Sequence, residues 1–179
     1  FSPAGVLAPV SKADLAFTMH MLSWLSTDGT AAIVEFPGVL YRGGTEKKIR
    51  EYLIKNNFVD AVIQLPPDLF FGVTIATCIL VLKKNKVTSD ILFIDASEEF
   101  KRYDSKNKLM PENIDRIANT ALHRSEEEYF SKLIPNDAVL DNNVNLSVSS
   151  YVEKKDEREE IDIVALNAEI ARIVVREDE

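Results

Sequence analysis

Residues 69–78 read Leu69-Phe70-Phe71-Gly72-Val73-Thr74-Ile75-Ala76-Thr77-Cys78 and continue directly into the apolar run Ile79-Leu80-Val81-Leu82. The two adjacent phenylalanines follow two prolines and precede a glycine, at a place where turns usually contain small or polar residues. Burial in a core does not readily explain both rings. A loop that displays aromatic rings can stack on a flat ligand such as a nucleobase. The pattern therefore predicts a functional loop that leads into a buried strand.

Two shorter runs rich in β-branched residues precede this loop, at residues 30–36 and 59–65, and turn residues bound both of them, as is typical of strands. Between the two runs the sequence predicts a helix that Thr45 can cap. Its solvent-facing side is expected to hold two i,i+4 ion pairs, Glu46 with Arg50 and Glu51 with Lys55. A strand, a helix and a strand in this order predict a parallel pair with a right-handed connection.

Residues 75–82 are apolar at nearly every position, which favours a strand buried on both faces in the middle of a sheet. The loop before this strand is too short to hold another helix. We therefore expect residues 75–82 to run antiparallel to the strand at residues 59–65.

Several longer segments lie in order along the chain and point to one family: residues 7–17, residues 38–50, the aromatic loop, residues 91–97 and residues 143–152. Together they resemble the modification (methylase) subunit of type I restriction-modification systems. The resemblance implies a site-specific DNA adenine methyltransferase that uses S-adenosylmethionine. It also implies an α/β fold: the C-terminal half of a Rossmann-like methyltransferase sheet, with parallel strands and an antiparallel final strand, followed by a helical tail.

The resemblance further implies a role for the aromatic loop. Methyl transfer to the adenine amino group requires the base to leave the duplex, and in the family an aromatic residue before the buried antiparallel strand stacks on that base. Phe70 is the first candidate because it lies five residues before Ile75, the spacing of the family's stacking residue, and Phe71 is the second. The alternative for one ring is that it plugs the end of the sheet, which we expect of Phe71.

Two motifs of the family are not found in this sequence. Its six glycines form no cofactor loop behind a strand. Leu65-Pro66-Pro67-Asp68 lacks the preceding Asn or Asp and the following aromatic residue of the family's catalytic motif. We therefore assign no catalytic, cofactor-binding or metal-binding residue here, and expect the catalytic and S-adenosylmethionine-binding motifs upstream of Phe1. The chain is then expected to be the C-terminal part of a larger subunit and inactive alone.

The composition is that of an ordinary globular protein, with 46% hydrophobic and 28% charged residues. No apolar run approaches the roughly 18 residues that a membrane span needs, so no membrane association is expected. The lone Cys78 lies in the predicted buried strand, which excludes a disulfide framework and favours a reducing cytoplasm. A small core side chain explains Cys78 better than a nucleophile does.

The net charge of -8 argues against an autonomous DNA-binding module. The resemblance removes this conflict, because in that family a separate specificity subunit reads the DNA sequence. It also implies a restriction subunit and a second methylase subunit as partners on DNA. Two lysine-rich clusters, at residues 47–50 and 83–86, could touch phosphate, but a solvated helix face and a charged turn explain them more simply.

The expected organisation has three parts. Residues 1–100 are the methyltransferase half. A capping-box spacing at Ser11 predicts a helix near the start of this part, and the apolar residues that follow predict that it is buried on two sides. Residues 101–152 are a helical extension and loop, with a helix that opens at Pro111. Residues 153–179 are a charged linker and the start of a partner-binding helix with heptad spacing.

Two functions remain open at this point. The chain either supplies the target-base loop of a methyltransferase, or it is an assembly module that only scaffolds the specificity and restriction subunits. In the resembled fold a further strand pairs with residues 30–36, and this chain does not contain it. The bare edge is therefore expected to make the fragment self-associate.

Overall fold

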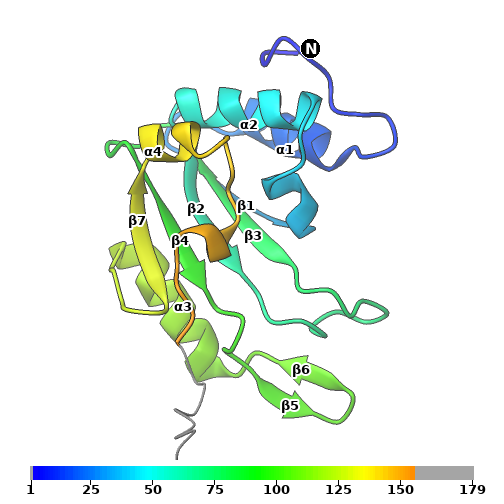
Figure 1. The fold of residues 1–179 in the computed structure, drawn as a ribbon, viewed down its shortest axis with the longest axis vertical. Coiled ribbons are helices and arrows are strands. Elements are labelled where there is room, and N and C mark those ends of the chain that lie inside the picture. Colours follow the sequence, from blue (N-terminus) through cyan, green and yellow to red (C-terminus); the bar gives the residue numbers. More distant parts are fainter. Residues whose placement is uncertain (1, 156–179) are drawn as a thin grey trace, which may run out of the picture.

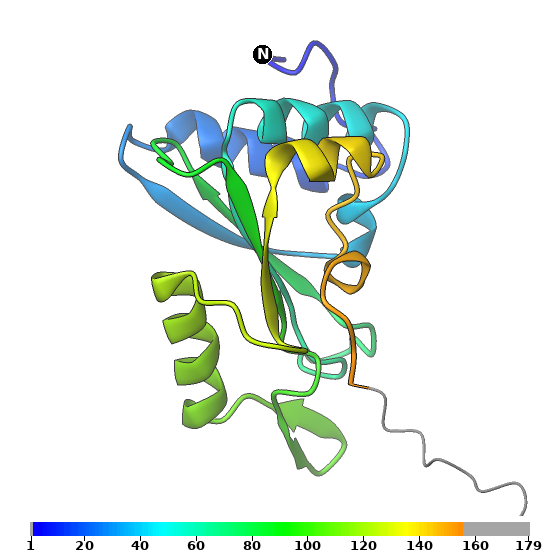
Figure 2. The same ribbon diagram turned by 60° about the vertical axis from the view of Figure 1, so that its left-hand side comes forward.

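The computed structural model describes residues 2–155 of the 179-residue chain. These residues form a five-stranded sheet and a separate two-stranded hairpin (Figure 1). The hairpin lies at the opposite end of the molecule from α2 and α4 in both ribbon views (Figures 1 and 2). The expected partner-binding helix and its heptad spacing lie outside the described residues.

The sheet has the order β1-β3-β2-β4-β7. In this order its strands are β1 (Thr30–Glu35), β3 (Cys78–Lys83), β2 (Val59–Gln64), β4 (Asp90–Asp95) and β7 (Ser131–Pro135). β3 runs antiparallel to both of its neighbours, β2 runs parallel to β4, and β7 runs antiparallel to β4. The predicted mixed α/β sheet with a central antiparallel strand is confirmed.

The expectation of an adjacent parallel pair before the aromatic loop is wrong. β1 and β2 run in the same direction, but β3 lies between them and pairs with both. The parallel neighbour of β2 is β4 instead. β3 can take this central place because its side chains are apolar on both faces, with Leu80 on one face and Ile79 on the other. β3 also begins at Cys78 rather than at residue 75, and Ile75 is exposed in the preceding loop.

A separate hydrophobic core covers each face of the sheet. On one face, α1 (Asp14–Trp24), α2 (Thr45–Lys55) and the 3-10 turn η1 (Pro37–Leu40) pack with α4 (Asn136–Asp141) and η2 (Val148–Ser150). On the other face, α3 (Pro111–His123) packs through Ile117. Residues 131–150 thus contribute β7, α4 and η2 to the same sheet and core as residues 14–95.

The predicted caps of both helices and the predicted burial of α1 are wrong. α1 starts after Ala13 without a side-chain cap, and α2 starts after Gly44, so neither Ser11 nor Thr45 caps a helix. α1 is also buried on one face only, because Phe17 and Trp24 are exposed. On α3, Ile117 is buried while Ile114 and Leu122 are exposed. No helix in residues 2–155 is long and apolar enough to cross a membrane.

Of the two ion pairs predicted on α2, the pair of Glu51 with Lys55 is confirmed and the pair of Glu46 with Arg50 is wrong. Lys55 Nζ contacts Glu51 Oε1 at 2.6 Å on the exposed side. Arg50 is instead almost fully buried and donates to the carbonyl oxygens of Val144 and Val39, both at 3.0 Å. Glu46 is buried as well, and its carboxylate contacts Arg42 Nη1 at 3.4 Å. The predicted helix is correct. However, the i,i+4 spacing of charged residues does not reveal that the later segment around Val144 covers this face of α2.

Candidate nucleic-acid interface

The aromatic loop, residues 65–77, joins the carboxyl end of β2 to the start of β3. Strand pairing places Glu35 opposite Cys78, and Gln64 opposite both Cys78 and Asp95. The carboxyl ends of β1, β2 and β4 therefore lie at the same end of the sheet as this loop. In open α/β sheets, ligands bind outside the carboxyl ends of the strands. The loop that the sequence singled out is thus at the end of the sheet where a ligand is expected.

The base of the loop is closed by hydrogen bonds to Thr77. The carbonyl oxygen of Thr77 accepts from the backbone N–H of Leu65 at 2.9 Å and from Gln64 Nε2 at 3.1 Å. These bonds hold the two ends of the loop together where it leaves the sheet.

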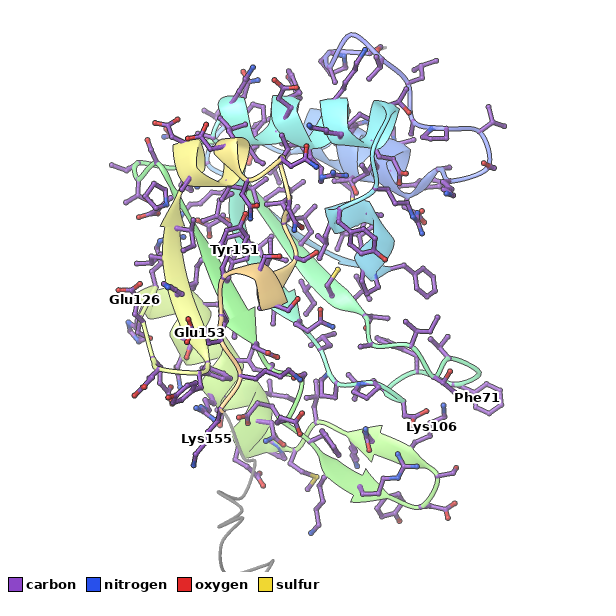
Figure 3. The ribbon with its side chains drawn as sticks, viewed as in Figure 1. Phe71, Lys106, Glu126, Tyr151, Glu153 and Lys155 are labelled. Carbon is purple, nitrogen blue, oxygen red and sulfur yellow. The ribbon has the colours of Figure 1, made fainter. Side chains whose placement is uncertain are left out.

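The tip of the loop is a β-turn that presents Phe71 to solvent. The Val73 N–H donates to the Phe70 carbonyl at 3.2 Å, and Gly72 has a φ of +72°. A turn with a positive φ at its third residue is of the type II class and strongly favours glycine there. Phe71 occupies the outer corner of this turn, and its ring projects away from the body of the molecule (Figure 3).

Both phenylalanines are accessible, and the expectation that Phe71 plugs the end of the sheet is wrong. Phe71 is 100% exposed and Phe70 is 42% exposed. Burying a phenylalanine is favourable by about 1.5–3 kcal/mol, so the fully exposed Phe71 ring contributes no such energy to the core and is free to meet a ligand. Phe70 is the partly sheltered member of the pair, at the first position of the turn.

A second element that the sequence did not reveal holds this loop in place. The hairpin of β5 (Lys101–Tyr103) and β6 (Lys106–Lys108) packs beside it. Asn107, which is buried, donates through Nδ2 to the Pro67 carbonyl at 2.9 Å and through its backbone N–H to the Asp68 carbonyl at 3.1 Å. Lys106 Nζ donates to the Val73 carbonyl at 3.1 Å on the other side of the tip. Lys106 lies between the loop and the hairpin in Figure 3.

Ion pairs strengthen the same contact. Asp68, which has a positive φ of 55°, receives Arg102 Nη1 at 3.3 Å and Lys106 Nζ at 3.7 Å. Arg102 also donates to Asn107 Oδ1 at 3.0 Å. The loop is therefore braced on both sides of its aromatic tip. The signal in the sequence was weak, because two three-residue strands that contain Lys, Arg, Asn and a single Tyr do not show an apolar alternation.

The two lysine-rich clusters that the sequence offered for phosphate contact are largely occupied by the protein itself. Arg50 is buried, and Lys47 donates to the Asn143 side chain. Lys84 donates to the Leu25 carbonyl, and Lys86 donates to the Val59 carbonyl at 2.6 Å. Burial lowers the pKa of Lys86 to about 8. These contacts occupy much of both clusters, but the buried Arg50 does not lie on the solvated helix face that the sequence predicted.

Cys78 is fully buried at the start of β3, and Sγ contacts the Glu35 carbonyl at 3.4 Å. Burial, with a smaller contribution from the Glu35 charge, raises the pKa of the Cys78 thiol to about 12. A thiol with so high a pKa is a poor nucleophile, as the sequence indicated. Within residues 2–155 there is also no group of three or more His, Cys, Asp or Glu side chains that could hold a metal ion.

A hollow near the end of the described chain does not suit a polyanion. It has a volume of about 550 Å³, and carboxylates outnumber cations among its lining residues, which include Asp95, Glu98, Glu99 and Glu128. Its Arg116 is engaged by Glu99 and Glu127 and lies 3.8 Å from the centroid of the Phe130 ring. The region that contains this hollow, marked by Glu126, Glu153 and Lys155, is on the opposite side of the molecule from Phe71 in Figure 3.

Comparison with known proteins supplies the family context. A family described as N-6 DNA Methylase matches residues 1–160. The chain is 52% identical over 175 residues to the type I restriction enzyme MpnII methylase subunit of Mycoplasma pneumoniae, covering 97% of this chain and 32% of that protein. It is 35% identical to the MjaVII methylase subunit of Methanocaldococcus jannaschii, covering 98% of this chain and 31% of that protein.

Among solved structures, the methyltransferase subunit of a type I restriction-modification system from Streptococcus thermophilus matches with a TM-score of 0.83 and 40% identity. That match covers 86% of this chain and 33% of the other. The chain therefore spans about a third of the length of the relatives that it matches. The sheet described above is part of a Rossmann-like methyltransferase fold.

Proposed function

Because this chain belongs to the N-6 DNA methylase family, we propose that it works as part of the DNA adenine methyltransferase subunit of a type I restriction-modification complex. Within that subunit it supplies the loop that receives the target base, together with contacts between subunits. One observation carries the proposal: a fully exposed phenylalanine and its half-exposed neighbour occupy the tip of a braced loop at the carboxyl end of the sheet.

The chemistry of the loop follows from the needs of the reaction. The amino group of adenine is reached only when the base leaves the stack, and the extruded base loses its stacking energy. An aromatic ring restores about 1–3 kcal/mol of that energy for any base. Phe70 is the proposed stacking residue, and Phe71, at the exposed corner of the turn, is the second candidate. The brace matters because the ring must be in position before the base arrives.

We infer that the described residues do not hold S-adenosylmethionine by themselves. The polar side chains at the carboxyl ends of the strands are engaged internally: Glu35 accepts from Thr18 at 2.7 Å, Gln64 donates to the Thr77 carbonyl, and Asp95 accepts from the Ser97 N–H. We derive no step through the methyl donor from these residues. In the proposal, the donor and the catalytic motif belong to another part of the longer subunit.

The proposed partners are DNA, a specificity subunit, a restriction subunit and a second methylase subunit. Phe17 and Trp24 on α1 are exposed and support a contact role for that face. The same observation favours the alternative function, in which the chain only scaffolds the other subunits. The two functions differ in what they require of the loop. Only the methyltransferase function requires the rings of Phe70 and Phe71 for methylation.

The discriminating experiment substitutes the loop in the full-length subunit assembled with its partners. Phe70→Ala is expected to lower single-turnover methylation about tenfold to a hundredfold, because one base-stacking contact of ~1–3 kcal/mol is lost. Assembly and S-adenosylmethionine affinity are expected to stay near wild type. Phe71→Ala is measured in parallel, and Val87→Ala, an exposed apolar residue in another loop, is the control. Unchanged methylation in both phenylalanine variants would leave only the scaffold function.

A further inference from the structure

The β5–β6 hairpin concentrates positive charge in an acidic chain. The chain has a net charge of -8, yet residues 101–108 contain Lys101, Arg102, Lys106 and Lys108 with Asp104 as their single acidic residue. The hairpin projects from the end of the molecule that also carries the aromatic loop (Figure 1). A local basic surface of this kind is the electrostatic footprint of a polyanion site.

The two faces of the hairpin differ in what they contact. Strand pairing sets Arg102 opposite Asn107 and Lys101 opposite Lys108. Because successive side chains of a strand point to opposite faces, these two pairs lie on different faces. The Arg102–Asn107 face is the one that braces the aromatic loop. The other face carries Lys101, Lys108 and Tyr103, all of which are exposed.

Lys106 shares the outer face by register, since it pairs with Tyr103. Its long side chain nevertheless reaches back to the loop, where it meets Asp68 and the Val73 carbonyl. The cations that brace the loop are thus Arg102 and Lys106, and the cations left for an outside ligand are Lys101 and Lys108.

The outer pair is costly for a purely structural hairpin. Like charges directly opposite each other on neighbouring strands destabilise the pair. Neither Lys101 nor Lys108 has an ion pair with any residue in the part of the chain that the structure describes. A polyanion that lies across both ammonium groups would remove this repulsion. The exposed Tyr103 beside them matches the mixture of cations and aromatic rings that tracks a nucleic-acid strand.

We propose that Lys101, Lys108 and Tyr103 form a contact surface for the phosphate backbone of the DNA next to the extruded base. The inference deepens the proposed function and rests on it, because the hairpin is bonded to the same loop that carries Phe70 and Phe71. One rigid unit then performs two tasks: its inner face positions the stacking loop, and its outer face holds the sugar-phosphate chain from which the base has turned out.

The test uses the full-length subunit assembled with its DNA-reading partner. Its DNA affinity is measured over a series of salt concentrations, with one duplex that contains the recognition site and one that does not. Each lysine that neutralises a phosphate releases counterions, so Lys101→Gln/Lys108→Gln is expected to reduce the slope of log affinity against log salt by about 1 per lysine. Binding should weaken by a similar factor on both duplexes, because phosphate contacts carry no sequence information.

The control variant Lys12→Gln/Lys132→Gln removes the same charge from exposed positions before α1 and on β7. Its salt slope is expected to stay at the wild-type value. The variant Lys101→Arg/Lys108→Arg, which keeps both charges, is expected to restore the slope. Thermal unfolding of each variant shows whether the fold is kept.

A wild-type slope in Lys101→Gln/Lys108→Gln, or an equal loss in the control variant, would overturn the inference. The proposed function fails separately, through unchanged methylation in the phenylalanine variants. A normal slope in the lysine variant together with lost methylation in Phe70→Ala removes only the hairpin surface. A reduced slope together with full methylation in both phenylalanine variants supports the phosphate contact and removes the stacking role.

Discussion

At the scale of single residues, Arg50 joins segments that are far apart in sequence. Its guanidinium donates to the carbonyls of Val39 and Val144 from the middle of α2. Val144 has a φ of 58°, a left-handed conformation that is unusual for a β-branched residue. Burial lowers the pKa of Arg50 to about 10, and the charge of Glu46 opposes this effect. The buried guanidinium thus satisfies two backbone carbonyls, and one of them belongs to a residue with a left-handed backbone conformation.

Arg50→Met tests that role. The substitution keeps an apolar stem in the core but leaves two buried carbonyls without their donor, and each such loss costs about 1–3 kcal/mol. We expect the free energy of unfolding in urea to fall by about 2–6 kcal/mol for the pair. Lys48→Met, an exposed position on the same helix, is the control. Equal urea midpoints for the two variants would contradict this account of Arg50.

Arg124 makes a second residue-scale junction, between β2 and β4. Its guanidinium contacts Asp60 Oδ1 and Asp90 Oδ1, each at 2.5 Å. Burial alone would raise the pKa of Asp90, but hydrogen bonds from Thr88 and Arg124 and the charges of Arg124 and Lys86 outweigh it, so the pKa is lowered. A carboxyl group with a lowered pKa stabilises the fold above its ordinary value of 3.8, and that contribution disappears as the pH falls through the lower folded value.

Asp90→Asn therefore has a pH-dependent effect on stability. We expect the variant to unfold at a lower denaturant concentration than wild type at neutral pH, because the charged partner of Arg124 is lost. The difference should shrink below the ordinary aspartate pKa, where protonation removes the same charge from the wild-type protein. Denaturant midpoints measured from neutral to strongly acid pH would show it. A difference that stays constant over this range would exclude the ion pair as its cause.

At the scale of elements, β1 is one of the two edge strands of the five-stranded sheet. Within the described residues it pairs only with β3, and Val34 is exposed along it. An unpaired edge with apolar side chains is a template for pairing with another chain.

We expect this chain on its own to form a dimer or a larger species in light scattering. Val34→Lys should shift it towards monomer, since a lysine on an edge strand opposes pairing. Lys132→Val is the control, because it replaces a lysine by valine on β7, the other edge strand of the sheet. This variant should still associate. A strict monomer at high concentration would exclude association through the β1 edge.

The elements also show how far the sequence could be interpreted. Strands were predicted where turn residues bound a run of β-branched and apolar residues, at residues 30–36, 59–65 and 75–82. Each run forms a strand whose bounds differ from the prediction by a few residues at most. The neighbours of β1 could not be predicted, because local pattern does not say that β3 turns back between two earlier strands. The hairpin at residues 101–108 could not be predicted because most of its residues are polar. Its position depends on contacts with the aromatic loop, which is distant in sequence.

The candidate site divides in the same way. Phe70, Phe71 and Gly72 indicated an exposed turn, because glycine allows the positive φ that such a turn requires. Which ring is sheltered depends on the direction of the turn, so the assignment of Phe71 to the sheet end failed. The brace formed by Asp68 with Arg102 and Lys106 depends on long-range packing that a single sequence does not reveal.

At the scale of the whole molecule, the described sheet is one part of the proposed enzyme. The chain spans about a third of the length of these relatives, and Glu35, Gln64 and Asp95 at the carboxyl ends of the strands are hydrogen-bonded within the chain. We therefore expect this chain alone to show no S-adenosylmethionine binding by calorimetry and no methyl transfer to DNA. Micromolar, stoichiometric binding of the cofactor to these 179 residues would contradict that division of labour.

The central claim is that the tip of residues 65–77 meets the extruded target base, and photo-crosslinking tests it most directly. A duplex with 5-iodouracil in place of the target adenine is bound to the full-length subunit with its partners and irradiated, and the adduct is located by mass spectrometry. The halogenated base reacts with an aromatic ring stacked against it, so the account predicts an adduct on Phe70, with Phe71 as the alternative, that disappears in Phe70→Ala/Phe71→Ala. An adduct found only outside residues 65–77 would contradict the claim.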